Sequence, residues 1–552
     1  MTFVSELDAT GSRYRDHTFY NAAVYTGGTH PRYVDCMVTR AGRVAWVGEH
    51  AQLPDAFRGG AATDLRGRMV VPSFTDSHAH PVDGFQLTCD ADLGGIQTFD
   101  GIRAAVQHCA QTHPQRAWVA AGNVVLEVLG EQSNREALDA MVPDRPLLLI
   151  SYDVHSGCLN TAALRLLGID ASTPDPEGGI YGRAANGEPN GLVHEAALYR
   201  LFPHLPQMSP VESAAALRKA LQQAHRFGVT GWFDAMVGQR LVDAYKRADD
   251  AGELLAHVSL GLLVSPTLAL APQIEKMQHW RASCSTDRVR AHTAKIFIDG
   301  VLESHTAALL EPYADVPHAG EAHWAPAQLR EAVFAADAAG FDLHFHTVGD
   351  RAVRMALDAL DALNRERGPA HLRDRRAQLA HVQLIDPDDV PRFRETGAIA
   401  SIQAVWANME PALRQLYTSL LGDARMERQY VFAELQRAGA MLSGGSDWPV
   451  STQNPLVAFE SAMRRASIGD SQAAALLPDQ CVDLETMLQA HTYHAAFSLR
   501  VDDALGTLAA GRPASFAVLE HDLRTVAPHE VAQVEVAMTV FEGEAVYGAL
   551  PT

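Results

Sequence analysis

The chain has 552 residues, 47% of them hydrophobic and 20% charged, which is an ordinary composition for a soluble globular protein but too much chain for one simple core. The formal net charge of −21 disfavours nucleic acids and anionic membranes as partners, because both attract clustered Lys and Arg. The six cysteines are scattered and include no Cys-x-x-Cys pair, which predicts reduced thiols. The sequence shows neither a signal-peptide pattern nor an apolar run long enough for a bilayer, so we expect a cytoplasmic protein.

Both ends of the chain alternate short apolar runs with turn residues, which is a strand pattern. The expected strands are Tyr20–Tyr25, Val34–Val38 and Arg43–Gly48 near the N-terminus, and Ala514–Leu519, Val534–Val540 and Ala545–Tyr547 near the C-terminus. Neither end has enough strands to cover a core alone. We therefore expect residues 1–72 and 501–552 to pair into one small β-sandwich beside the central domain.

The middle of the chain, residues 73–500, alternates strand patterns with helix patterns. An apolar run that ends at His78 is the first strand candidate, and the others are Gly228–Asp234, His257–Leu263, Thr293–Asp299, Phe341–His346, Gln378–Gln383, Ala398–Gln403 and Ala440–Gly445. Eight strands alternating with helices predict an α/β fold, the (β/α)8 TIM barrel. One connection, residues 84–212, is far longer than a βα unit needs, so we expect it to form an insertion over the barrel mouth.

Five of these strands carry a histidine, a lysine or an aspartate within or just after their C-terminal part. The first strand ends in His78-Ala79-His80, and because strand side chains alternate, the two histidines share one face. An isolated His-x-His is as often a pair of solvent-facing histidines in a turn. Four more polar residues follow in order on later strands, and a parallel barrel delivers them all to one mouth: Lys295, His346, His381 and Asp447. Nitrogen and carboxylate donors without thiolate predict a zinc site, with manganese, iron or cobalt as alternatives.

The chain resembles the amidohydrolase superfamily, and within it the YtcJ-like hydrolases of amidohydrolase family 3, which include N-substituted formamide deformylase-type enzymes. The resemblance runs almost from end to end, as far as Gly506–Ala514, and its most specific segments are Lys295–Ala308, His346–Val353, His381–Asp388 and Gly445–Pro455. It implies His78, His80, His346, His381 and Asp447 as metal ligands, and it implies that Lys295 is a lysine that is often carboxylated and bridges two ions. The sequence departs from the family at Ser73, Ala380 and Ser515, and Ala380 puts the tuning of His381 in question.

The expected chemistry follows from these ligands. A divalent ion makes hydroxide available at neutral pH, and Asp447 would take the proton of the attacking water and pass it to the departing nitrogen. His346 or His381 would steady the oxyanion if not fully committed as a ligand. Without carboxylation, Lys295 would orient Asp447 or the water, and the site would hold one ion, so both alternatives remain open.

Several neighbouring residues have both a functional and a structural interpretation. His155 and Asn160 match a family segment of the insertion, and Gln403, Trp406 and Trp448 follow late strands, so these five residues are candidates for substrate binding. Asp76 and Asp299 are either orienting partners of ligands or structural hydrogen bonders. His344 shares the face of His346 but lies one barrel layer deeper, which favours an interior histidine over a ligand.

These features predict a metal-dependent hydrolase that cleaves a non-peptide C–N bond of a small molecule, such as an amide, an N-substituted formamide, a carbamate or a cyclic amide. The alternatives are a deaminase of the same superfamily and, from another class, a non-catalytic scaffold or regulatory barrel. We expect no nucleic-acid or membrane partner. A homo-oligomer, either a dimer or a tetramer, is common among relatives.

Overall fold

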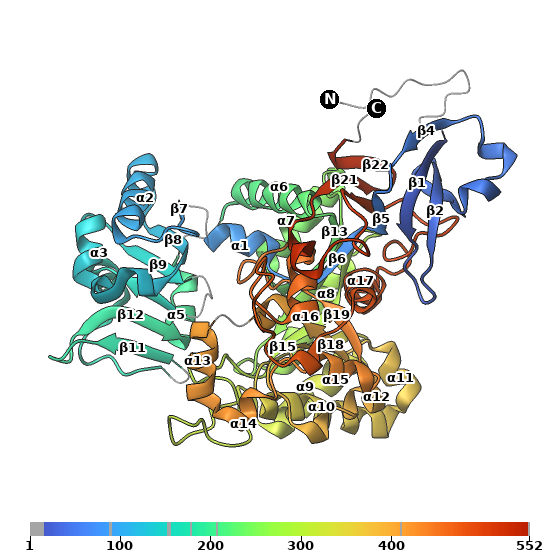
Figure 1. Ribbon diagram of the computed structural model, residues 1–552. Helices are drawn as coiled ribbons and strands as arrows, with labels where there is room; N and C mark the ends of the chain where they lie inside the picture. The colour runs from blue at the N-terminus through green and yellow to red at the C-terminus, as the bar shows by residue number, and fades with distance from the viewer. Residues whose placement is uncertain are drawn as a thin grey trace.

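The computed structural model describes residues 16–549 of the chain, except 88–90, 152–155, 177–178, 206–207 and 409–410. Three β-sheets organise the described residues: a parallel barrel sheet, a sheet formed by the two ends of the chain and a sheet within the insertion. In Figure 1 the barrel occupies the centre, the insertion lies at the left and the terminal sheet at the upper right.

The barrel consists of eight parallel strands that are hydrogen-bonded in chain order. The strands are β6 (Phe74–Ala79), β13 (Val229–Val237), β14 (His257–Val264), β15 (Val289–Phe297), β16 (Asp342–Thr347), β17 (Gln378–His381), β18 (Ile399–Ile402) and β19 (Met441–Gly444). All but a few of their residues are buried, as expected for parallel strands covered on both faces. The predicted TIM barrel is confirmed.

Backbone hydrogen bonds beyond the strand ends join the first strand to the last at the mouth. The amide of Asp447 donates to the carbonyl of His78 at 2.7 Å, and the amide of His80 donates to the carbonyl of Trp448 at 2.8 Å. Two residues of the predicted metal site are therefore held together by main-chain bonds across the seam of the barrel.

Helices fill the connections after the barrel strands. In chain order they are α1 (Pro81–Leu87), α6 (Pro210–Arg226), α7 (Gln239–Asp250), α8 (Leu270–Cys284), α9 (Pro326–Ala338), α10 (Asp350–Arg367), α11 (Pro369–Asp374), α12 (Arg392–Thr396), α13 (Pro411–Leu421), α14 (Asp423–Met426), α15 (Phe432–Arg437), α16 (Pro455–Arg464), α17 (Leu484–His491) and α18 (Tyr493–Ser498). α6 shows how the sequence specifies such a helix: Ser209 and Glu212 form a capping box, and Pro210 takes the first helical position. Its buried side chains recur every three or four residues and face the barrel core.

The insertion between β6 and β13 forms its own six-stranded sheet, with two apolar clusters of its own. Its strands are β7 (Ala91–Asp92), β8 (Val119–Val124), β9 (Leu147–Ser151), β10 (Ser156–Leu159), β11 (Gly179–Arg183) and β12 (Pro189–Glu195), and its helices are α2 (Phe99–Thr112), α3 (Arg135–Met141), α4 (Thr161–Leu167) and α5 (Ala196–Tyr199). The hydroxyl of Ser304, in the loop after β15, donates to the carboxylate of Glu195 at the end of β12. The insertion thus meets the barrel on the side of its mouth, as predicted.

The two ends of the chain form one eight-stranded sheet, which confirms that both termini build one β-domain. Its strands are β1 (His17–Tyr25), β2 (Tyr33–Arg40), β3 (Arg43–Gly48), β4 (Ala61–Asp64), β5 (Met69–Pro72), β20 (Phe516–Leu519), β21 (Val536–Phe541) and β22 (Glu544–Gly548). β5 joins the halves, because it pairs with β1 on one side and with β20 on the other. In Figure 1 the blue N-terminal strands and the red C-terminal strands accordingly lie side by side.

The apolar run before the His-x-His pair belongs to two sheets and not to one strand. β5 ends at Pro72 in the terminal sheet, and β6 begins at Phe74 in the barrel. The amide of Ser73 between them donates to the carbonyl of Ser515, whereas the amide of Phe74 donates to Gly228 at the start of the next barrel strand. The change of hydrogen-bond partner at this residue is the boundary between the two sheets.

Glu542, in the turn between β21 and β22, joins the terminal sheet to the bottom of the barrel. Its carboxylate lies 3.2 Å from Nε2 of His257 and 2.7 Å from the guanidinium of Arg288. The hydrogen bond with His257, and after it the bond and charge of Arg288, outweigh burial and lower the pKa of Glu542 to about 2. A carboxylate with a lowered pKa stabilises the fold above its unfolded pKa of 4.5, and that contribution is lost as the pH falls towards 2.

Glu542→Gln is therefore expected to lower the melting temperature by about 2 °C at pH 7, measured by calorimetry. The difference between the variant and the wild type should shrink as the pH falls below about 5. Glu544→Gln, at the exposed first position of β22, is the matched control and should leave the melting temperature unchanged. Equal melting temperatures of wild type and Glu542→Gln at pH 7 would contradict the proposed link.

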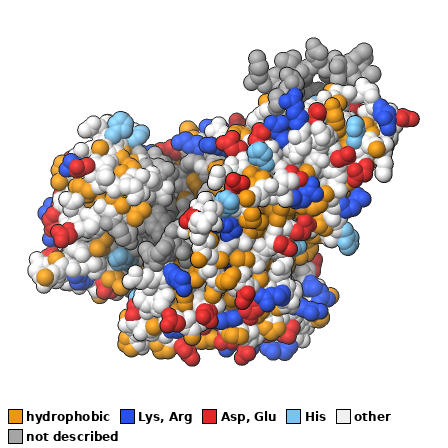
Figure 2. All heavy atoms as spheres, in the orientation of Figure 1, with side chains coloured by type: hydrophobic (Ala, Val, Ile, Leu, Met, Phe, Trp, Pro, Cys, Tyr) orange, Lys and Arg blue, Asp and Glu red, His pale blue; other side chains and the backbone are white. Residues whose placement is uncertain are grey.

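The surface of the described residues is mixed in charge. Acidic and basic side chains are interspersed over the face of the barrel seen in Figure 2. Among the helices of the described residues, none combines the length and the apolar character that crossing a membrane requires.

Candidate metal centre

The six predicted ligand residues lie together at the mouth of the barrel. His78 and His80 come from the end of β6 and the residue after it, Lys295 from β15, His346 from β16, His381 from the end of β17 and Asp447 from the loop after β19. The strand register aligns these positions, because Phe297 is paired with His346 and Thr347 with His381. Side chains of five separate strands thus reach one place.

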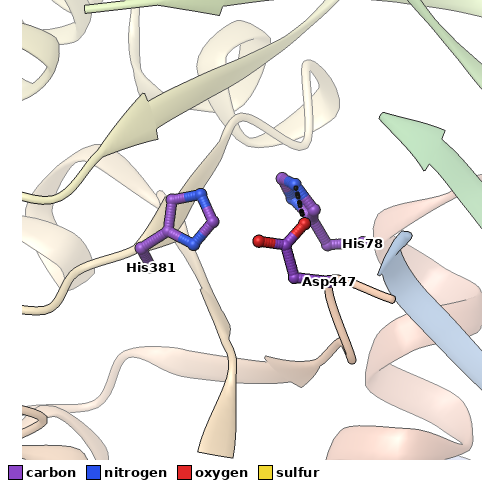
Figure 3. A group of neighbouring side chains, drawn as sticks. All are labelled: His78, His381 and Asp447. Carbon is purple, nitrogen blue, oxygen red and sulfur yellow. Dashed lines mark ion pairs between the residues drawn. The ribbon is translucent and has the colours of Figure 1, made fainter. Parts of the chain in front are cut away.

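Three of these residues form the centre of the cluster. His78, His381 and Asp447 are buried, and each offers one donor atom within 4.8 Å of the donor atoms of the other two. Figure 3 shows the two imidazole rings on either side of the carboxylate. Nε2 of His78 lies 3.4 Å from Oδ1 of Asp447. Two nitrogens and a carboxylate oxygen at this spacing are a suitable set of donors for a divalent ion.

The other three residues extend this cluster. Nε2 of His80 lies 3.3 Å from the same Oδ1 of Asp447. The ring of His346 packs against the ring of His381 with centroids 4.5 Å apart. The ammonium of Lys295 interacts electrostatically with both Asp447 and His78. The cluster is therefore continuous, with Asp447 at its centre.

Burial favours the uncharged form of three of these groups, His78, His381 and Lys295. Desolvation, helped by the nearby Lys295 or by neighbouring histidines, holds the pKa of His78 and His381 well below the usual value of 6.5. Desolvation likewise lowers the pKa of Lys295 to about 7, although the charge of Asp447 opposes it. His80 differs: burial lowers its pKa, but the hydrogen bond and charge of Asp447 outweigh burial, and the net shift is upward. Neutral imidazoles and a neutral amine are the forms that bind metals.

Unpartnered polar atoms show that this set fits a metal ion. Within the part of the chain that the structure describes, neither ring nitrogen of His381 has a hydrogen-bond partner, and neither has Nζ of Lys295. Both residues are almost completely buried, at 1% and 0% exposure. A buried polar atom without a partner destabilises a fold, so a bound ion would satisfy groups that these protein atoms leave unsatisfied.

Two of the central residues have an unusual backbone conformation. His381 and Asp447 have φ values of 75° and 54°, which residues other than glycine rarely adopt. Gln403 Oε1 accepts the amide of His381 at 3.0 Å, and the carbonyl of His78 accepts the amide of Asp447 at 2.7 Å. These bonds hold both side chains towards the centre, and strain of this kind is concentrated at functional sites.

Two buried aspartates, Asp76 and Asp299, make hydrogen bonds to predicted ligand residues or to their neighbours in the chain. Asp76 accepts the amide of His78 at 3.2 Å and both the amide and the hydroxyl of Ser446, the residue before Asp447. Asp299 accepts three backbone amides, and its Oδ1 lies 3.1 Å from Nδ1 of His346. Burial raises the pKa of Asp76 to about 6 and that of Asp299 to about 7, against the effect of these hydrogen bonds. The sequence left open whether Asp76 and Asp299 orient the predicted ligands or only make structural hydrogen bonds, and these contacts support the first interpretation.

Asp234 is a further acidic group beside the cluster, and it does not belong to the residues predicted from the sequence. It lies in β13, it is 1% exposed, and it interacts electrostatically with His80. Tyr245 donates to its Oδ2 at 2.7 Å, and burial raises the pKa of Asp234 to about 7. Asp234 is the last residue of the predicted second strand, and this position at the C-terminal end of a barrel strand is the sequence feature that indicates a side chain at the mouth.

The predicted substrate-binding residues have different surroundings. His155 lies outside the described residues. Asn160 is completely buried in the insertion, where its amide caps α4 and bonds to the backbone of residues 142–147, so the structure does not bring it to the cluster. Gln403 is also fully buried and holds the backbone of His381.

The two tryptophans lie at the rim of the cluster. Trp406 stacks on His381, with ring centroids 5.0 Å apart and planes at 3°. Trp448 packs over Gly84 of α1, where a Cβ atom would clash with its ring. Both are partly exposed, so aromatic surface remains available beside the ligands.

Comparisons with known proteins agree with this geometry. Residues 61–547 match the model of the Amidohydrolase family. The chain is 27% identical over 555 residues to N-substituted formamide deformylase of Arthrobacter pascens, covering 96% of this chain and 98% of that protein. It is 29% identical over 512 residues to Protein LONG AFTER FAR-RED 3 of Arabidopsis thaliana, and the alignment covers 90% of this chain and 86% of that protein. An uncharacterized metal-dependent hydrolase from Pyrococcus horikoshii has the same fold, with a TM-score of 0.73 at 22% identity over 96% of this chain and all of that one.

The family match covers most of the chain, including the whole barrel sheet, the sheet of the insertion and every residue of the predicted metal cluster. The protein belongs to the amidohydrolase family of hydrolytic enzymes.

Proposed function

We propose that the protein hydrolyses a non-peptide C–N bond of a small molecule, with an N-substituted formamide as the first substrate class to test. The reaction class follows from the family, and the formamide follows from the relative that shares 27% of its residues over nearly the full length of both chains. The observation that carries the proposal is the cluster of nitrogen and carboxylate groups around the buried His78, His381 and Asp447, in which the ring nitrogens of His381 and Nζ of Lys295 have no hydrogen-bond partner among the described residues.

His78, His80, His346, His381 and Asp447 would hold the ion, with zinc as the best match to these ligands and manganese, iron or cobalt as alternatives. When bound, such an ion supplies hydroxide at neutral pH and polarises a carbonyl oxygen. Asp447 accepts the proton of the attacking water on its carboxylate and then donates it to the departing nitrogen, which leaves as a neutral amine. An imidazole of His346 or His381 that does not bind the ion fully would stabilise the oxyanion.

The wall of the site is aromatic. Trp406 and Trp448 present ring surface beside the cluster, and Phe297 stacks on His346 with centroids 5.0 Å apart. Such surfaces suit an apolar substituent on the nitrogen of a formamide or an amide.

Lys295 is proposed to carry a carboxyl group that bridges two ions. Its amine, with a pKa of about 7, is available in the neutral form that attacks carbon dioxide, forming an N–C bond and releasing a proton. We expect metal-free protein to take up a second equivalent of zinc only when bicarbonate is present, as measured by mass spectrometry of bound metal. Lys295→Met should hold a single equivalent with or without bicarbonate. Uptake of two equivalents by this variant would contradict the bridging role.

The direct test of the function is a panel of formamides, amides, carbamates, cyclic ureas and amidine-type compounds given to the metal-loaded protein. The expected result is release of an amine together with one equivalent of acid from at least one formamide or amide. Asp447→Asn loaded with the same metal is the blank. Release of ammonia from an amidine-type carbon would instead identify a deaminase. The absence of turnover on the whole panel would favour the non-catalytic alternative.

The location and the assembly of the protein stay predictions. The cytoplasm is expected from the sequence, and a dimer or tetramer from the relatives.

A further inference from the structure

A buried histidine outside the predicted ligand set, His344, contacts His78 of the cluster from a position deeper in the barrel than the mouth. His344 lies on β16, two residues before His346, and is 0% exposed. Its Nε2 lies 3.0 Å from Nδ1 of His78, and the two ring centroids are 4.9 Å apart. In the closed order of eight strands, β16 is four strands from β6 in either direction, so this contact crosses the interior of the barrel.

This contact determines which nitrogen of His78 is available. A neutral imidazole has one donor and one acceptor nitrogen, so a hydrogen bond between two neutral rings uses the donor of one and the acceptor of the other. Nδ1 of His78 is occupied by His344, whereas Nε2 of His78 faces Asp447 Oδ1 at 3.4 Å. Nε2 is therefore the nitrogen that points into the cluster.

His344 is itself held in place. The ring of Phe233 on β13 packs against it with centroids 4.5 Å apart and planes at 31°. Phe233 also lies near His78, with ring centroids 6.5 Å apart. On the other side, His344 is paired in the strand register with Lys295 of β15. The packing against Phe233 restricts the ring of His344, which can in turn hold the ring of His78 that it contacts.

We propose that His344 is a positioning residue, which holds the ring of His78 with Nε2 towards the cluster and so sets the affinity of the site for its metal. The inference rests on the proposed metal site. Histidines that bind metals usually give their second nitrogen to a carboxylate, a carbonyl or a water, and loss of such a partner typically weakens metal binding by about 10- to 100-fold. Here a neutral imidazole from the opposite side of the barrel has that role.

The test measures zinc affinity by competition with a chelator and the visible absorption bands of the cobalt-loaded protein, with no need for a substrate. His344→Phe keeps a ring of similar size for Phe233 but cannot bond to His78. We expect it to weaken zinc binding by about 10- to 100-fold and to shift the cobalt bands. His344→Gln, whose terminal amide reaches about as far as Nε2, should restore most of the affinity and the wild-type spectrum.

Two further variants keep the test decisive. His292→Phe places the same ring on β15, beside Asp342 at 3.9 Å, and should bind zinc like the wild type. If His344→Phe does not fold, His344→Asn has the same expectation, because its shorter side chain cannot reach His78. A folded His344→Phe or His344→Asn protein with affinity within twofold of wild type and unchanged cobalt bands would overturn the proposal. A wild-type protein that binds no zinc or cobalt would instead overturn the proposed function on which it rests.

Discussion

Removal of divalent metal is expected to reduce hydrolysis of the best substrate by at least about 10³-fold. The reason is that a bound ion lowers the pKa of water from about 15.7 to about 7 and contributes several kcal/mol of charge stabilisation, and each 1.36 kcal/mol corresponds to about tenfold in rate. The nitrogens of His78 and His381 and the carboxylate of Asp447 are close enough to bind one ion and are buried away from competing water. Dialysis against a chelator followed by a rate measurement at pH 7 is the experiment.

Restoration is the control for this prediction. Addition of zinc, manganese, cobalt or iron to the stripped protein should recover the activity, and the order of recovery identifies the preferred ion. The circular dichroism of the stripped protein should match that of the loaded protein, because the large core cluster of the barrel consists of apolar residues and includes none of the predicted ligands. Stripped protein with undiminished turnover and no residual metal would contradict the whole assignment.

Asp447→Asn is expected to lower kcat by about 10²- to 10⁴-fold, the usual contribution of a general acid–base group. The carboxylate lies 3.3 Å from His80 and 3.4 Å from His78, at the centre of the cluster, and an amide in its place cannot accept the proton of the attacking water. Asparagine tolerates the positive φ of 54° at this position better than most residues do, so the fold should be preserved. The measurement is kcat at saturating substrate, together with bound metal and melting temperature.

Asp144→Asn is the matched control for this variant. Asp144 has a side chain that is 71% exposed, and its carboxylate lies near Arg145 in the insertion, so its replacement should leave kcat unchanged. A kcat of Asp447→Asn within tenfold of the wild-type value, at equal metal content, would remove Asp447 from its role as acid and base.

The barrel could be predicted from the sequence because each of its strands is a local feature. Segments such as His257–Leu263 and Ala440–Gly445 are short apolar runs bounded by turn residues, and they appear in the structure as β14 and β19 with shifts of one residue at the ends. The terminal strands were recognisable for the same reason. The division of the first apolar run at Ser73 was not, because it depends on which distant strands pair with Val70 and with Phe74.

The six residues of the cluster could also be predicted, because parallel strands bring their C-terminal ends to one mouth whatever the loops between them do. The residues predicted to bind the substrate could not be assigned in the same way. Asn160 was expected in the pocket but caps a helix of the insertion, and only the packing of that segment decides where its amide points.

The sequence by itself determined the barrel, the terminal β-domain and the set of polar residues at the mouth, since strand periodicity and the order of residues along the chain report local geometry and parallel topology. Only the tertiary structure decided that His344 meets His78, that Asp234 lies near His80 and that Trp406 lies flat on His381. These are contacts between strands or loops far apart in the chain, and their geometry depends on how the closed barrel brings distant backbone segments together.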